Sequence, residues 1–271
     1  MDAKRRAKWG AKLRGFRDAA DGQLTREQVA SAHGIMQRVA LVFPLGRAWL
    51  YGVRRLLAAA HLSPKVRMGP EVREDIQVYI DFLGLEPGDC PPTPALTRHG
   101  PRRASRTISD ASFQALSGAT LRDDGLEYWV HVLTDDELAH VGTARDEMHI
   151  TRLELVAAAH NLLIWPPGQA DHVEMVADNM AACEMINAGV ARRDPVCNAA
   201  LQTISRVLRG RGATIAAVHV PTDENWICDT ATRTNPARFA AFLQRTYPGL
   251  ATRRVSLQGS PLRDYLPTPP S

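Results

Sequence analysis

Apolar residues follow one spacing in the first part of the chain and another after about residue 100. Before that point they recur every three or four residues, as in the series Val29, Ala32 and Met36, and this spacing is typical of one face of a helix. Thr25 and Gln28 form a capping-box pattern, which predicts that the first of these helices begins there. We therefore predict that the first part of the chain is helical.

A stretch rich in proline and glycine separates the two patterns. It contains Pro87, Gly88, Pro91, Pro92, Pro94, Gly100 and Pro101. This composition predicts a linker at residues 85–104, between a small helical segment at 1–84 and a domain at 105–248. The proline-rich residues 249–271 are expected to form a disordered tail.

Beyond the linker, short apolar runs alternate with helical patterns. Five strands are predicted, at residues 107–110, 116–121, 126–133, 172–177 and 214–220. The turn residues Asp123-Asp124-Gly125 predict a hairpin between the second and third strands. The fourth and fifth strands flank helices, so they are expected to run parallel to the first through right-handed crossovers. The predicted fold class is α/β, a mixed five-stranded sheet flanked by helices.

Four carboxylates fall at junctions between these elements. Asp110 ends the first strand, Glu154 lies in the first turn of the next helix, Asp178 ends the fourth strand, and Asp229 lies at or just before the last helix. Functional groups gather at the carboxyl ends of parallel strands, so Asp110 and Asp178 would lie side by side if their strands are neighbours. Carboxylates brought together repel each other, and a shared Mg²⁺ or Mn²⁺ removes that cost. Two such ions suit the hydrolysis of a phosphodiester.

Each acid also has a structural interpretation. Glu154 would complete a capping box with Thr151. Asp110 would be a turn residue, and Asp178 would cap a helix that begins at Asn179. Asp229 would cap or precede the final helix. From spacing alone, both interpretations stay open.

The same residues carry a resemblance to a known family. Five segments resemble, in order, the motifs of the ribonuclease H domain of reverse-transcribing elements. They are Ile108-Ser109-Asp110-Ala111-Ser112, Ile150-Thr151-Arg152-Leu153-Glu154-Leu155, Val176-Ala177-Asp178-Asn179, Arg193-Asp194-Pro195, and His219-Val220-Pro221 continuing to Cys228-Asp229. Residues 28–50 resemble the segment between polymerase and ribonuclease H in retroelements, especially the DIRS-like group.

The resemblance implies a ribonuclease H-like fold and an activity. Asp110, Glu154, Asp178 and Asp229 would be catalytic residues and would hold two Mg²⁺ ions, with Mn²⁺ as the alternative. The reaction would be hydrolysis of the RNA strand of an RNA/DNA hybrid. The chain would be a piece of a reverse transcriptase polyprotein, so a polymerase domain is an expected partner. The alternative is a remnant that has lost catalysis and only binds nucleic acid; the replacement of a family glycine by Thr222 favours it.

The charge of the chain is modest but uneven. The net charge is +4, yet residues 1–17 carry seven basic side chains against Asp2 alone, and Arg98, Arg102, Arg103 and Arg106 form a second basic cluster. Such clusters attract nucleic acid, and they are equally typical of a solvated terminus and linker. Contacts with nucleic acid are expected at Arg102, Arg103 and Arg106, and the resemblance adds Asn179.

Other features exclude several classes of protein. No apolar run reaches the ~18 residues that a membrane helix needs, so no membrane association is expected. No apolar stretch follows the basic N-terminus, so a secretory signal is not expected. Cys90, Cys183, Cys197 and Cys228 show no C-x-x-C pairing. They are interpreted as reduced thiols of an intracellular protein, cytoplasmic or nuclear.

Overall fold

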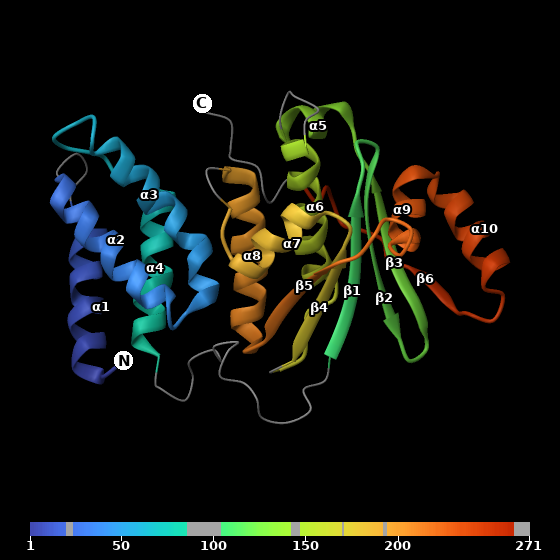
Figure 1. Cartoon of the computed structure of the whole chain (residues 1–271), viewed down its shortest axis with the longest axis horizontal. Coiled ribbons are helices and arrows are strands. Elements are labelled where there is room, and N and C mark those ends of the chain that lie inside the picture. The colour runs from blue at the N-terminus through green and yellow to red at the C-terminus, as the bar shows by residue number, and fades with distance from the viewer. Residues whose placement is uncertain (20–23, 86–103, 142–146, 170, 192–193, 263–271) are drawn as a thin grey trace. The chain divides into compact units, whose positions relative to one another are not determined.

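The structure is a computed structural model of the 271-residue chain, and it describes residues 1–19, 24–85, 104–141, 147–169, 171–191 and 194–262 (Figure 1). The chain divides into two compact units, residues 1–98 with 188–193 and residues 99–187 with 194–271, and the first boundary falls within the segment predicted as a linker, residues 85–104. Most of that segment, with Arg102 and Arg103, lies outside the described residues. The first unit contains the N-terminal helices, and the second contains a sheet with its own helices.

The first unit is a small helical bundle. Its elements are α1 (Ala3–Arg17), α2 (Arg26–Ala40), the 3-10 helix η1 (Pro44–Trp49), α3 (Leu50–Ala59) and α4 (Pro70–Gly84). The capping box predicted at Thr25 and Gln28 is present in both directions. In the core, the rings of Phe43 and Phe82 stack with centroids 4.2 Å apart, and the Tyr79 hydroxyl donates to the Gly46 carbonyl over 2.7 Å. These contacts join η1 to α4.

The second unit is built on one mixed sheet. Its strands are β1 (Ala104–Ala111), β2 (Ala115–Arg122), β3 (Gly125–Val132), β4 (His172–Ala177), β5 (Thr214–His219) and β6 (Thr252–Arg254). The order is β5-β4-β1-β2-β3-β6. The hairpins β1-β2 and β2-β3 are antiparallel, whereas β4 is parallel to β1 and β5 is parallel to β4. The predicted α/β fold class, a mixed sheet flanked by helices, is confirmed.

The sixth strand corrects two predictions. β6 pairs with the outer edge of β3, so the sheet has six strands instead of five. It lies within residues 249–271, which were expected to be disordered. The backbone of β3 supplies the reason, because Leu126 N–H donates to Ala251 O and Val255 N–H donates to Tyr128 O, each over 2.8 Å. A three-residue strand carries too little periodicity to be seen in the sequence. Residues 263–271 lie outside the described part.

Helices cover both faces of the sheet (Figure 1). Those of the second unit are α5 (Asp135–Val141), α6 (Glu147–Ile164), α7 (Met180–Ala188), α8 (Pro195–Arg211), α9 (Trp226–Arg233) and α10 (Pro236–Thr246). On the face of α6, the buried Asn161 accepts from Trp129 Nε1 and donates to the Ile108 carbonyl. On the other face, α9 and α10 pack on an apolar cluster that includes Tyr128 and Phe239. The alternation of side chains along each strand lets one sheet build two cores.

Two further observations concern the expected class of protein. Among the helices of the described chain, none is long and apolar enough to cross a membrane. Cys183, Cys197 and Cys228 are buried free thiols. Cys90 lies outside the described residues.

Candidate active site

The topology of the sheet brings two of the predicted acids together. In the parallel pair of β1 and β4, Ile108 lies opposite Val176. Asp110 lies two positions further along β1, and Asp178 directly follows the end of β4, so both reach the same end of the sheet. Glu154 comes to the same place from α6, which packs against β1.

Three carboxylates therefore form one cluster. One oxygen atom from each of Asp110, Glu154 and Asp178 lies within 4.8 Å of the other two. Asp110 is 4% exposed and Glu154 is 2% exposed, whereas Asp178 is half-buried. The cluster thus has a buried floor and a more open side at Asp178.

Each buried carboxylate has one oxygen held by the protein. Asp110 Oδ2 accepts from the Thr232 hydroxyl over 2.6 Å, and Glu154 Oε1 accepts from the Ala111 backbone N–H over 3.0 Å. Glu154 Oε2 is buried and has no hydrogen-bond partner. A buried carboxylate oxygen without a partner is costly, so this atom indicates a ligand position.

The electrostatics of the cluster favour a cation. Burial, together with the charges of Asp178 and Asp229, raises the pKa of Asp110 to about 7, although the hydrogen bond from Thr232 acts in the opposite direction. Burial and the charges of Asp110 and Asp178 raise the pKa of Glu154 well above its ordinary value. A divalent cation would remove the repulsion, and an all-oxygen donor set suits Mg²⁺ or Mn²⁺. The residues present therefore fit such an ion.

Asp229 lies beside the cluster but is not part of it in the described structure. It is on α9, and its charge contributes to the raised pKa of Asp110. Its Oδ1 accepts from Arg233 Nε over 2.6 Å, one helical turn away, and the Arg233 side chain is 67% exposed. The structure thus brings three of the four predicted ligands together, with the fourth engaged in a surface ion pair.

Three of the structural interpretations do not hold. Asp110 lies within β1, opposite Ser117 of β2, and is therefore not a turn residue. α6 begins at Glu147, so Thr151 lies buried inside the helix and forms no capping box with Glu154. α7 begins at Met180, and Asn179 caps it by accepting from the Ala182 N–H over 2.9 Å. Asp178 is therefore not the cap. The predicted contact of Asn179 with nucleic acid stays a prediction.

Sequence reasoning missed three contributors to the site. It did not assign a role to Thr232 or Arg233, which hold Asp110 and Asp229. It assigned no catalytic role to His219, whose Nε2 lies 3.1 Å from the Asp178 carbonyl oxygen. Their positions could have indicated a role, because Thr232 and Arg233 lie three and four residues after Asp229, which places them near Asp229 on one helix.

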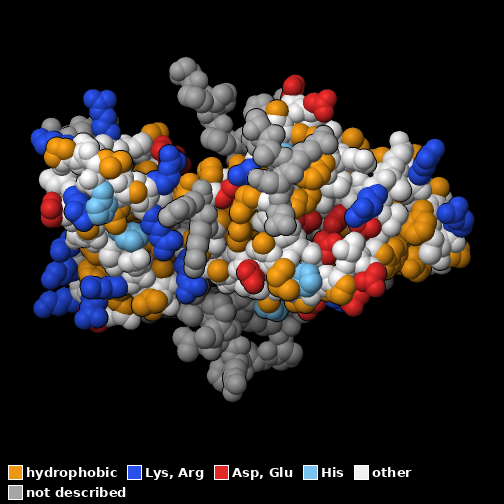
Figure 2. Space-filling model, turned by 45° about the horizontal axis from the view of Figure 1, so that its top comes forward, with side chains coloured by type: hydrophobic (Ala, Val, Ile, Leu, Met, Phe, Trp, Pro, Cys, Tyr) orange, Lys and Arg blue, Asp and Glu red, His pale blue; other side chains and the backbone are white. Residues whose placement is uncertain are grey.

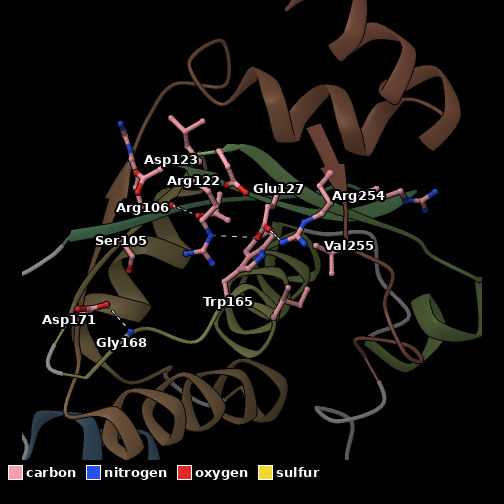
Figure 3. A pocket seen from close by; sticks show the side chains of 15 residues that line it. Ser105, Arg106, Arg122, Asp123, Glu127, Trp165, Gly168, Asp171, Arg254 and Val255 are labelled. Atoms are coloured by element: carbon pink, nitrogen blue, oxygen red, sulfur yellow. Dashed lines mark hydrogen bonds and ion pairs between the residues drawn. The ribbon is translucent and has the colours of Figure 1, made fainter. Parts of the chain in front are cut away.

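Arg106 lies far from the acids. It is four residues before Asp110 on an extended strand, which corresponds to about 13 Å, and its Nε pairs with Glu174 Oε1 at 3.0 Å. It lines a cavity of about 1030 Å³ at the opposite end of the sheet (Figure 3). Glu127 in that cavity pairs with both Arg122 and Arg253. The lining has four arginines and four acids, so it offers no net charge to a ligand.

Comparisons with known proteins find only weak structural similarities. No family model and no curated protein matches the chain. Among solved structures, RNase H1 of the archaeon Halobacterium salinarum NRC-1 is 16% identical, with 48% of this chain and 95% of that one covered and a TM-score of 0.34. The foamy viral protease-reverse transcriptase with DNA appears twice, at 12% and 13% identity and TM-scores of 0.29 and 0.25. There, 79% and 69% of this chain are covered, but only 35% and 40% of the viral chains. TM-scores this low carry no argument, so the functional case rests on the geometry.

Proposed function

We propose that the chain is a metal-dependent ribonuclease of the ribonuclease H type, which hydrolyses the RNA strand of RNA/DNA hybrids. The observation that carries the proposal is the convergence of Asp110, Glu154 and Asp178 at the carboxyl ends of β1 and β4. These acids also lie in three of the segments that resemble, in order, motifs of the ribonuclease H domains of retroelements.

The side chains have distinct roles in this proposal. Two Mg²⁺ ions, or Mn²⁺, would supply the positive charge that activates a water and stabilises the leaving oxygen. Asp110 and Glu154 form the rigid part of the cradle, because each has one oxygen fixed by a hydrogen bond. Asp178 is the more open acid, so it faces the incoming phosphodiester. Asp229 joins the cradle when it leaves Arg233.

Recognition of the substrate follows from its backbone. The basic side chains of the N-terminal cluster contact phosphates without reading bases. RNA is distinguished from DNA by its 2′-hydroxyl in a shallow minor groove. We propose further that the chain is a fragment of a DIRS-like reverse transcriptase polyprotein, and that it works with a polymerase domain.

Hydrolysis of a labelled RNA/DNA hybrid in the presence of Mg²⁺ tests the proposal. We expect cleavage of the RNA strand, no cleavage of double-stranded DNA, and loss of cleavage in EDTA. Asp178→Asn should abolish turnover, whereas Asp124→Asn, at the β2–β3 turn, should not. Activity that survives Asp178→Asn would contradict the site.

One observation favours a second function. Arg233 Nε donates to the Asp229 carboxylate, so this acid is already paired with a cation. This pairing favours a module that keeps the fold and binds nucleic acid without turnover. This alternative predicts hybrid binding with a steep salt dependence. It also predicts no cleavage at any concentration of Mg²⁺ or Mn²⁺, so the same experiment separates the two functions.

A further inference from the structure

Thr232 connects the cluster of acids to a helix that contributes none of its three members. It lies in the last turn of α9, is 2% exposed, and places its hydroxyl 2.6 Å from Asp110 Oδ2 on β1. The hydroxyl also lies 3.0 Å from the Asp229 carbonyl oxygen, an acceptor within its own helix. The shorter contact goes to the carboxylate, and its length is typical of a hydroxyl that donates to an ionised acid.

The donor is held rigidly. Threonine is β-branched, so its side chain has few rotamers in a helix. α9 itself is fixed, because Cys228 and Ala231 are buried in the apolar cluster and the Ser117 hydroxyl donates to the Cys228 carbonyl over 3.1 Å. The direction of the Thr232 hydroxyl is therefore set by packing against the sheet.

We propose that Thr232 is a positioning residue of the metal site, which holds the Asp110 carboxylate so that it faces Glu154 and Asp178. The inference rests on the proposed function and deepens it. Thr232 does for Asp110 what the Ala111 N–H does for Glu154: it fixes one oxygen and leaves the group aimed into the cluster. The rotation of a ligand carboxylate is thereby restricted before any cation binds, and such outer contacts govern the affinity of metal sites.

Mn²⁺ binding to the full chain, measured by electron paramagnetic resonance of the free ion, tests this role without turnover. Thr232→Val keeps the shape but removes the donor, so we expect about tenfold weaker binding. Thr232→Ser keeps the donor and should restore binding to near the unsubstituted level. Thr234→Val is the matched control, because within the described part of the chain its hydroxyl donates to the Thr230 carbonyl and not to an acid. Its Mn²⁺ affinity should not change.

The outcomes separate this inference from the proposed function. Equal Mn²⁺ affinity in the Val variant and the unsubstituted chain would overturn the role of Thr232 alone, as would a Ser variant as weak as the Val variant. No Mn²⁺ binding by the unsubstituted chain would overturn the proposed function and this inference with it. Circular dichroism in EDTA checks folding. If Thr232→Val does not fold, Thr232→Ala against Thr232→Ser makes the same comparison.

Discussion

Asp110 combines burial with repulsion from neighbouring acids. Its pKa of about 7 lies far above the ordinary value of 3.8, and burial is the main cause. Between these two pH values the folded chain holds a proton that the unfolded chain releases. Without metal, the free energy of unfolding must therefore fall as the pH rises from about 4 to about 7. The clustered carboxylates therefore lower the stability of the metal-free protein at neutral pH.

Asp110→Asn should remove this loss of stability at neutral pH. In EDTA at pH 8, we expect the variant to be more stable than the unsubstituted chain by on the order of a few kcal/mol. At pH 4 the difference should be much smaller, because the carboxyl is protonated in the folded chain and partly protonated in the unfolded chain, whose ordinary pKa is 3.8. Urea unfolding at the two pH values measures the difference, and Asp124→Asn serves as the exposed control. A difference that does not depend on pH would contradict the electrostatic origin.

Arg233 pairs with Asp229, the fourth predicted metal ligand. The guanidinium is mostly exposed, so its bond to Asp229 stabilises the fold by less than about 1 kcal/mol. Arg233→Gln should leave the free energy of unfolding nearly unchanged and should raise Mn²⁺ affinity, because Asp229 no longer shares its charge. Arg238→Gln on α10 is the control. Unchanged Mn²⁺ affinity in Arg233→Gln would show that Asp229 takes no part in the site.

At the scale of elements, the sequence predicted the features that depend on residues close together in the chain. The β2–β3 hairpin follows from Asp123-Asp124-Gly125, where Gly125 has a positive φ of 146°, and the strands follow from their apolar runs. The sequence predicts one last helix near Asp229 and does not predict α9 as a separate helix, because no side chain caps its first turn and it contains β-branched residues. It is held instead by burial of Cys228 and Ala231 against β2 and β3. The contact between Thr232 and Asp110 depends on that packing, so it could not be predicted.

Gly118 on β2 lies against Asn161 of α6, which leaves no room for a side chain. A Cβ there would overlap Asn161 Oδ1 and Trp129 Nε1, which hydrogen-bond to each other. Gly118→Ala should cost about 1–3 kcal/mol of stability, because the buried pair must shift. Gly210→Ala on α8 is the control, since nothing lies within 4 Å of the added methyl and alanine favours helix. Chemical denaturation compares the two, and equal stability would contradict the predicted overlap.

At the scale of the whole molecule, charge is distributed unequally along the chain. Residues 1–85 contain 15 Lys and Arg against 8 Asp and Glu, so the remaining residues contain 18 against 21. Lys and Arg side chains gather over the helical unit (Figure 2). α1 carries no acid, and five of its basic side chains are exposed: Lys4, Arg5, Lys8, Lys12 and Arg14. The acidic cluster and the basic helix thus belong to different units.

This division of charge predicts how binding depends on salt. Each phosphate contact contributes about 0.9 to the slope of log K against log salt in B-form DNA. The double variant Lys8→Gln/Lys12→Gln should therefore bind an RNA/DNA hybrid more weakly at low salt in EDTA, with a slope reduced by up to about twice that amount. Fluorescence anisotropy over a salt series measures both the affinity and this slope. Arg206→Gln/Arg211→Gln on α8 removes the same charge from exposed positions of the other unit and should leave the slope closer to that of the unsubstituted chain. Equal slopes in all three proteins would show that α1 does not contact the nucleic acid.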